Sequence, residues 1–169
     1  SDYSAAIYAK HLNAKVLEIW TDVSGVFSAN PKIVKNASPI AYLSYKEAME
    51  LSFFGAKVIY FPTLQPLIED NIPVFIKNTF KPDEEGTCIS NSTKLDNDEI
   101  VKGISHIENI SILNFEGSGM VGVPGFSKRF FEVLSYNNIN VIMITQASSE
   151  FSICIAIDSN DADLAKKVV

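Results

Sequence analysis

The stretch that decides the fold is Val16-Leu17-Glu18-Ile19-Trp20-Thr21-Asp22-Val23-Ser24-Gly25. Its first half is apolar except for one glutamate, with β-branched and aromatic side chains, and it predicts a strand over residues 16–20. A hydroxyl and a carboxylate follow directly, and a serine-glycine pair then marks a turn. Before the strand, alanine and leucine recur at helical spacing and predict a helix over residues 2–13. A helix followed by a strand with a polar end indicates an α/β domain.

Helices and strands continue to alternate after this stretch. Ser44 and Glu47 form a capping-box pattern, which predicts a helix that ends at Gly55. A short helix over residues 63–70 and a buried strand over residues 73–76 come next. The alternation predicts a parallel, doubly wound sheet.

Polar and turn-forming residues dominate from residue 81 to residue 100, and we place the domain boundary there. The prediction is a first domain over residues 1–90, a linker over 91–100 and a second domain over 101–169. The second domain should contain strands over 109–116, 141–145 and 151–158, and helices over 126–136 and from 161 onward. The order β-α-β-β-α is most of a ferredoxin-like unit. Because no final strand follows, we expect this module to be incomplete or to be completed by another chain.

Composition and charge exclude several classes of protein. The chain has 169 residues, of which 47% are hydrophobic, and its net charge is -6, so it is globular and offers no basic surface for nucleic acid. Cys88 and Cys154 lack metal-ligand spacing, and His11 and His106 do not complete a zinc pattern, so we expect no metal held by these side chains. No apolar run would cross a bilayer and no signal peptide is visible, which predicts a cytoplasmic location without a membrane partner.

Three positions have the chemistry of a phosphate or nucleotide site, and each has a simpler interpretation. Asp22 follows a strand, where α/β sheets bind ligands, but aspartate is also a common turn former. Lys57 could reach a phosphate, although most surface lysines do not. Asp2 begins a helix, where anions bind, but it could be a simple cap.

Four segments together resemble the amino-acid kinase fold of aspartate kinases. They are SDYSAA (1–6), WTDVSGV (20–26), AMELSFFGAKV (48–58) and IPVFIKNT (72–79). Two further segments, VKGIS (101–105) and ITQASSE (144–150), make the chain most similar to the bifunctional enzymes that fuse aspartate kinase to homoserine dehydrogenase. The resemblance covers nearly the whole chain.

The resemblance implies a fold and a reaction. The fold would be the C-terminal, nucleotide-binding half of an amino-acid kinase domain, with a parallel-rich sheet and helices on both faces, followed by an α+β ferredoxin-like ACT domain. The reaction would be phosphorylation of the β-carboxylate of L-aspartate by ATP with Mg²⁺, under feedback inhibition through the ACT domain. A non-catalytic module that senses amino acids is the alternative.

The family's nucleotide positions fall on six residues of this sequence, by resemblance: Thr21, Asp22, Phe27, Lys32, Lys57 and Val58. The family often has tyrosine where Phe27 stands and arginine where Lys32 stands. This sequence therefore lacks the tyrosine hydroxyl and the guanidinium group that can bind a phosphate through two hydrogen bonds. Ser1 would bind substrate and Asp2 would be catalytic, since they match the end of a Gly-Arg-Gly-Gly-Ser-Asp-like motif. The rest of that motif and the family's Lys-Phe-Gly-Gly segment do not occur in the sequence. The chain therefore reads as cut, and we expect it to be inactive by itself.

The glycine-rich stretch Gly117-Ser118-Gly119-Met120-Val121-Gly122 has two interpretations. It fits a dinucleotide-binding pattern, but no acidic residue ends the next strand and too little sequence follows. As the first turn of an ACT module, it would hold an effector amino acid, for which the resemblance suggests threonine. The expected effector residues are Met120, Val121, Gln146, Ser148 and Ser149, with Gln146 the most important because its amide both donates and accepts. A capped strand end with incidental polar residues is the alternative, and we expect a homo-oligomer paired through ACT domains.

Overall fold

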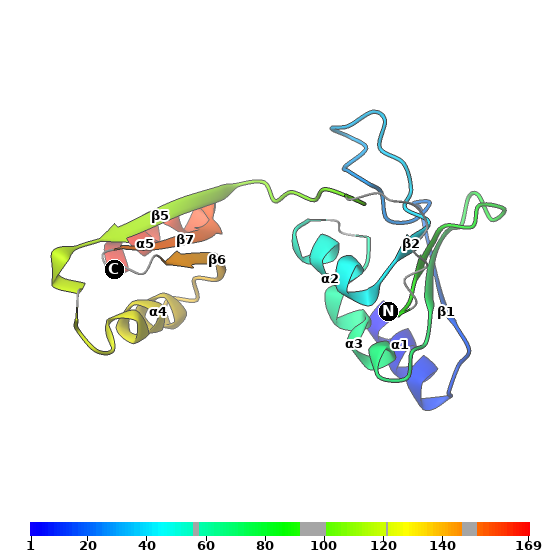
Figure 1. Cartoon of the computed structure of the whole chain (residues 1–169), viewed down its shortest axis with the longest axis horizontal. Helices are drawn as coiled ribbons and strands as arrows, with labels where there is room; N and C mark the ends of the chain where they lie inside the picture. The colour runs from blue at the N-terminus through cyan, green and yellow to red at the C-terminus, as the bar shows by residue number, and fades with distance from the viewer. Residues whose placement is uncertain (56–57, 92–100, 121, 147–151) are drawn as a thin grey trace. The chain divides into compact units, whose positions relative to one another are not determined.

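The computed structural model describes residues 1–55, 58–91, 101–120, 122–146 and 152–169. The chain forms two compact units, Ser1–His106 and Ile107–Val169, each with its own sheet and helices (Figure 1). The predicted linker over 91–100 lies almost wholly outside the described residues, so the proposed domain boundaries stay predictions. Within the described ranges, no helix has both the length and the apolar composition needed to span a membrane.

The first unit contains the predicted helices and strands together with two strands that the sequence did not reveal. In chain order they are α1 (Asp2–His11), β1 (Leu17–Thr21), β2 (Tyr42–Leu43), α2 (Tyr45–Phe53), η1 (Phe61–Thr63), α3 (Gln65–Ile68), β3 (Val74–Asn78) and β4 (Thr87–Ile89). The prediction missed β2 and β4, because strands of two and three residues are too short to show alternation.

The sheet of the first unit has the strand order β1-β3-β4-β2. The pairs β1–β3 and β2–β4 are parallel, which confirms a parallel-rich sheet. The pair β3–β4 is antiparallel, so the sheet is parallel-rich but not parallel throughout. The cause is a short return loop that makes a crossover helix unnecessary. Gly86 closes this loop with a φ of +74°, and a Cβ there would lie 2.0 Å from the carbonyl oxygen of Ile76.

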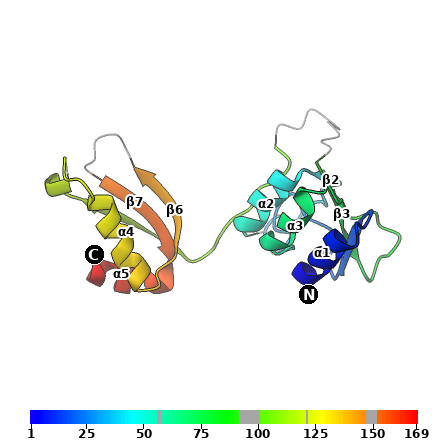
Figure 2. The same cartoon turned by 90° about the horizontal axis from the view of Figure 1, so that it is seen from below.

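The core of the first unit lies between the sheet and the helices. Leu64, Leu67 and Ile76 are fully buried in it. The capping box that the sequence predicted at α2 is present, since the amide of Glu47 donates to Oγ of Ser44 at 3.1 Å and the amide of Ser44 donates to Oε2 of Glu47 at 2.7 Å. Figures 1 and 2 show α1, α2 and α3 gathered beside the sheet.

The second unit has the predicted β-α-β-β-α order. Its elements are β5 (Ile110–Glu116), η2 (Ser118–Met120), α4 (Phe126–Tyr136), β6 (Val141–Gln146), β7 (Ser152–Asp158), η3 (Ser159–Asp161) and α5 (Ala162–Val168). The strand order is β5-β7-β6, and both pairs are antiparallel. Alternate residues of β7, Ile153, Ile155 and Ile157, are at most 1% exposed and belong to the same apolar cluster as residues of α4 and α5. Figure 2 shows both helices against one face of the sheet, which confirms the ferredoxin-like ACT arrangement.

Candidate functional site

Polar side chains gather where β1 and β3 end together. Thr21 and Asn78 are the last residues of these parallel strands and lie opposite each other in the register. The hydroxyl of Thr21 donates to Oδ1 of Asp22 at 3.1 Å, and the exposed Asp22 carboxylate lies just beyond the strand. Because α/β sheets bind ligands outside the carboxyl ends of parallel strands, this edge is a candidate binding site.

A buried amide holds the two loops that leave this edge. Asn78 is only 6% exposed, its Nδ2 donates to Oγ of Ser24 at 2.9 Å, and its Oδ1 accepts from the amide of Phe80 at 2.9 Å. A hydrogen bond from Ser24, assisted by Lys81, lowers the pKa of Glu84 below its usual value. Sequence reasoning missed this network. The available signal was an asparagine two residues after Ile76, where the alternation of β3 places an inward-facing side chain.

The loop over residues 26–40 follows the same strand and carries two predicted nucleotide positions. The amide of Val26 donates to Oγ1 of Thr87 at 2.8 Å, and Thr87 Oγ1 donates to the carbonyl oxygen of Ile40 at 2.7 Å, so one buried hydroxyl ties both ends of the loop. Phe27 is half-buried and forms an antiparallel bridge with Pro39. Lys32 is exposed, which leaves its ammonium group accessible to an anion.

The remaining predicted kinase positions lie on other elements. The hydroxyl of Ser1 donates to Oδ1 of Asp2 at 3.1 Å, and Asp2 lies in the first turn of α1, where the helix dipole favours a negative charge. Val58 packs against the core, and Lys57 lies outside the described residues. The predicted residues thus come from the start of α1, the end of β1, the loop after it and the segment after α2. Their meeting around one nucleotide stays a prediction.

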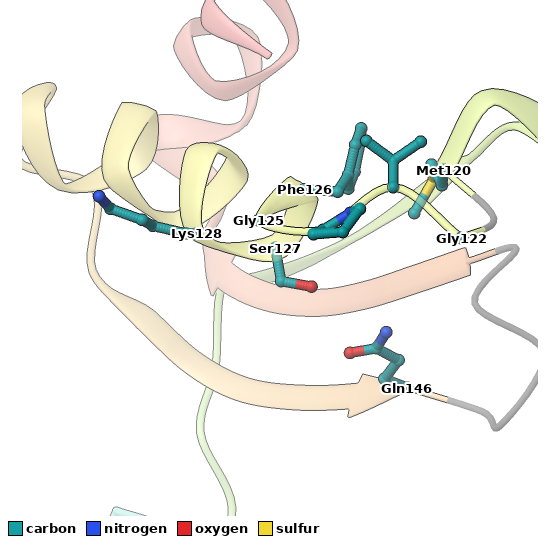
Figure 3. A pocket seen from close by; sticks show the side chains of 9 residues that line it. Met120, Gly122, Gly125, Phe126, Ser127, Lys128 and Gln146 are labelled. Atoms are coloured by element: carbon teal, nitrogen blue, oxygen red, sulfur yellow. The ribbon is translucent and has the colours of Figure 1, made fainter.

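The second unit contains a cavity of about 350 Å³ between the start of α4 and the end of β6. Its described lining comprises Met120, Gly122, Val123, Pro124, Gly125, Phe126, Ser127, Lys128 and Gln146. Figure 3 shows Gln146 reaching from the end of β6 toward the first turn of α4, with the side chain of Ser127 facing it. The structure therefore brings two predicted effector residues, Met120 and Gln146, to one cavity. The other three, Val121, Ser148 and Ser149, lie outside the described residues.

The helix start that faces this cavity has no side-chain cap. Gly125 is the N-cap of α4 with a φ of +80°, and it offers no side chain to the free N–H groups of the first turn. The helix dipole adds positive potential there, so an anionic group of a ligand is favoured. Sequence reasoning missed Ser127 and the absence of a side-chain cap. The signal was a helix that begins directly after a glycine, without the usual Ser, Thr, Asp or Asn cap.

The structure rules against the dinucleotide interpretation of the glycine-rich stretch. The G-x-G-x-x-G stretch ends at Gly122 and the helix α4 starts only at Phe126, so that stretch does not open directly into the helix. The sheet of the unit is antiparallel in both of its described pairs, whereas a dinucleotide fold needs a parallel βαβ unit. In the described parts of both units, no group of three or more His, Cys, Asp or Glu side chains could hold a metal ion.

Comparisons with known proteins agree with this arrangement. Residues 1–78 match the amino acid kinase family, and residues 113–169 match the ACT domain. The bifunctional aspartokinase/homoserine dehydrogenase of Haemophilus influenzae is 47% identical over 169 residues, which is all of this chain and 21% of that protein. Lysine-sensitive aspartokinase 3 of Escherichia coli is 35% identical over 159 residues, covering 94% of this chain and 34% of that protein.

Solved structures show the same likeness. E. coli aspartokinase III in complex with aspartate and ADP has a TM-score of 0.78 at 33% identity, over 93% of this chain and 34% of that chain. The same enzyme in complex with lysine and aspartate has a TM-score of 0.75 at 29% identity, over 99% of this chain and 38% of that chain.

The fold and the matches define a class of protein, an amino acid kinase segment joined to an ACT domain. Within that class, the relatives and solved structures that the chain resembles are aspartokinases, among them enzymes fused to homoserine dehydrogenase. It spans about a fifth of the length of the curated bifunctional relatives that it matches.

Proposed function

We propose that this chain works within an aspartate kinase. The β-carboxylate oxygen of L-aspartate forms a bond to the γ-phosphorus of ATP as the bond to the β,γ-bridging oxygen breaks, giving 4-phospho-L-aspartate and ADP. This product would enter the biosynthesis of threonine, lysine and methionine. The similarity to bifunctional aspartokinases over the whole chain supports the proposal, as does the likeness to an aspartokinase solved with aspartate and ADP. Since the chain spans about a fifth of its bifunctional relatives, the complete reaction is a proposal for the whole protein.

The nucleotide would lie at the carboxyl edge of β1 and β3. Thr21 and Asp22 end the strand there, and the exposed ammonium of Lys32 would act as a point charge on the phosphates. Asp2, in the first turn of α1, would lie on the aspartate side of the transferred group. Among the described residues, no three or more His, Cys, Asp or Glu side chains gather as ligands for Mg²⁺.

The cavity of the second unit would bind the effector, and we propose L-threonine. The free N–H groups of the first turn of α4 suit an α-carboxylate, while the amide of Gln146 can both accept from an α-amino group and donate to a hydroxyl. The described lining contains no carboxylate that could pair with the ammonium group of a lysine effector, which favours an uncharged side chain. The observation that carries the proposal is the placement of Gln146 opposite the uncapped start of α4 (Figure 3).

Replacing Gln146 tests the effector site. Gln146→Ala should weaken L-threonine binding roughly tenfold or more, because a desolvated amide with two hydrogen bonds is lost. Thr145→Ala is the matched control, since Thr145 precedes it on β6, is exposed and does not line the cavity. Isothermal titration calorimetry measures both variants beside the unchanged chain. Equal threonine affinities for Gln146→Ala and Thr145→Ala would count against the site.

Pairing of ACT units into a dimer stays a prediction. In the described sheet β5 is an edge strand, and Ile112 in its middle is 66% exposed. A second copy of this chain could pair with this edge and bury the apolar side chain. Sedimentation of the chain at micromolar concentrations should show dimers, and a monomer throughout would refute the pairing.

A further inference from the structure

Residues 101–106, here called the strap, lie against the first unit. The amide of Ile104 donates to the carbonyl oxygen of Ser28 at 2.8 Å, and this backbone hydrogen bond joins the strap to the loop over residues 26–40. Ser28 in turn donates its own amide to the carbonyl oxygen of Ser38 at 2.8 Å. The strap therefore bonds to the same backbone stretch that presents Phe27 and Lys32.

An ion pair fixes the strap to helix α2. Nζ of Lys102 lies 3.0 Å from the carboxylate of Glu47, and the two side chains are 31% and 38% exposed. The same carboxylate accepts the Ser44 amide at 2.7 Å in the capping box. Because one carboxylate serves both contacts, the start of α2 and the strap hold a common position.

Close packing shows that the strap is fitted to this surface. A Cβ at Gly103 would lie 3.2 Å from Cδ1 of Ile40 and 3.3 Å from the carbonyl oxygen of Ser28. At the other end, a Cβ at Gly55, whose φ is +114°, would lie 2.0 Å from the carbonyl oxygen of His106. At Gly55 the approach leaves no room for a Cβ, and at Gly103 a Cβ would be in tight contact that requires the neighbouring atoms to shift by a few tenths of an ångström.

We propose that the strap is a positioning element for the nucleotide, with Lys102 as its positioning residue. It holds the loop over residues 26–40 in the geometry in which Phe27 and Lys32 contact the nucleotide, and this inference rests on the proposed role of those two residues. His106 ends the first unit and Ile107 begins the unit with the effector cavity, so the strap is the stretch of chain leading from one to the other.

Four single substitutions in the whole chain test this role. Lys102→Met removes the charge and keeps the length, while Glu47→Gln removes the opposite charge and keeps an acceptor for the Ser44 amide. Lys102→Arg should rescue the contact. Lys10→Met is the matched control, because Lys10 is a similarly exposed lysine, at 33%, that pairs with Glu69, the residue directly after α3.

Two measurements distinguish an effect on the order of the strap and loop from an effect on nucleotide binding. Amide hydrogen exchange should become faster at Ile104 and Ser28 in Lys102→Met and Glu47→Gln, with the Glu47 amide of Lys102→Met unchanged as an internal reference. The dissociation constant for MgADP should rise about three- to fivefold in both variants, and no further in the double variant, as expected for one shared ion pair. Lys102→Arg and Lys10→Met should behave like the unchanged chain in both measurements.

The outcomes distinguish the inference from the proposed function. Unchanged exchange at Ile104 and Ser28 in Lys102→Met would overturn the positioning role, whatever the nucleotide affinity. Faster exchange with unchanged MgADP affinity would also overturn it, because the loop would then move without consequence for the nucleotide. A chain that binds no MgADP at all would instead refute the nucleotide role of Phe27 and Lys32, while the exchange result would still decide whether the strap orders the loop.

Discussion

At the scale of single residues, Tyr45 shows how a polar group is accommodated in the core. Its side chain is 3% exposed, and its hydroxyl donates to the carbonyl oxygen of Ile72 at 2.6 Å. Burial, assisted by the nearby Cys88, raises the pKa of Tyr45 to about 12. The bond joins the start of α2 to the residue that leads into β3.

Removing this hydroxyl should destabilise the first unit. Tyr45→Phe leaves the carbonyl oxygen of Ile72 without this donor, and we expect a loss of about 1–2 kcal/mol in the free energy of unfolding, measured with urea. Tyr60→Phe is the matched control, because Tyr60 is 65% exposed. If the two variants unfold at the same urea concentration, the buried hydrogen bond contributes nothing to stability.

The same residue predicts a dependence on pH. The folded pKa of about 12 lies above the ordinary value of 10.0, so the folded state keeps the proton longer than the unfolded state. The contribution of Tyr45 is therefore complete below pH 10 and is lost as the pH rises toward 12. Tyr45→Phe should flatten the decline in stability over this window, as urea unfolding at a series of pH values would reveal.

The sequence could predict some site residues and not others. Thr21 and Asp22 were visible because they follow a clear strand, and the resemblance pointed to Met120 and Gln146. The contact between Asn78 and Ser24 joins residues 54 positions apart, and its geometry depends on the strand register. Local sequence patterns do not encode such a pairing, so this part of the site needed the structure.

At the scale of elements, long helices were predictable and short strands were not. The capping box and the apolar spacing located α2 and α4, because such signals are local. The antiparallel pairing of β3 with β4 depends on the return loop that ends at Gly86. Alternation of helices and strands favours parallel pairing on average and carries no information about one short hairpin.

The cap of α2 gives a prediction at this scale. Ser44→Ala should destabilise the chain by about 1 kcal/mol, because the Glu47 amide loses its acceptor. Ser52→Ala is the control within the same helix. The hydroxyl of Ser52 donates to the carbonyl oxygen of Ala48, which already accepts a backbone hydrogen bond of the helix, so its loss leaves no backbone group without a partner. Urea unfolding compares the two, and equal effects would contradict the importance of the cap.

At the scale of the whole molecule, two units carry two proposed sites. The described lining of the effector cavity belongs wholly to the unit Ile107–Val169, and the proposed nucleotide residues belong to Ser1–His106. The proposed binding of threonine therefore does not require the kinase segment to be catalytically complete. We expect the 169-residue chain by itself to show no aspartate-dependent turnover of ATP, since several cationic groups must act together on the phosphoryl group and the family's Lys-Phe-Gly-Gly segment is not in its sequence.

Titration calorimetry of the chain with L-threonine, L-lysine, L-methionine and MgATP tests the central claim most directly. We expect saturable heat with L-threonine, at one site per chain and with the highest affinity of the three amino acids, together with binding of MgATP. Heat with threonine but none with MgATP would favour the alternative of a non-catalytic sensing module. Absence of heat with all three amino acids, or tighter binding of lysine than of threonine, would contradict the account.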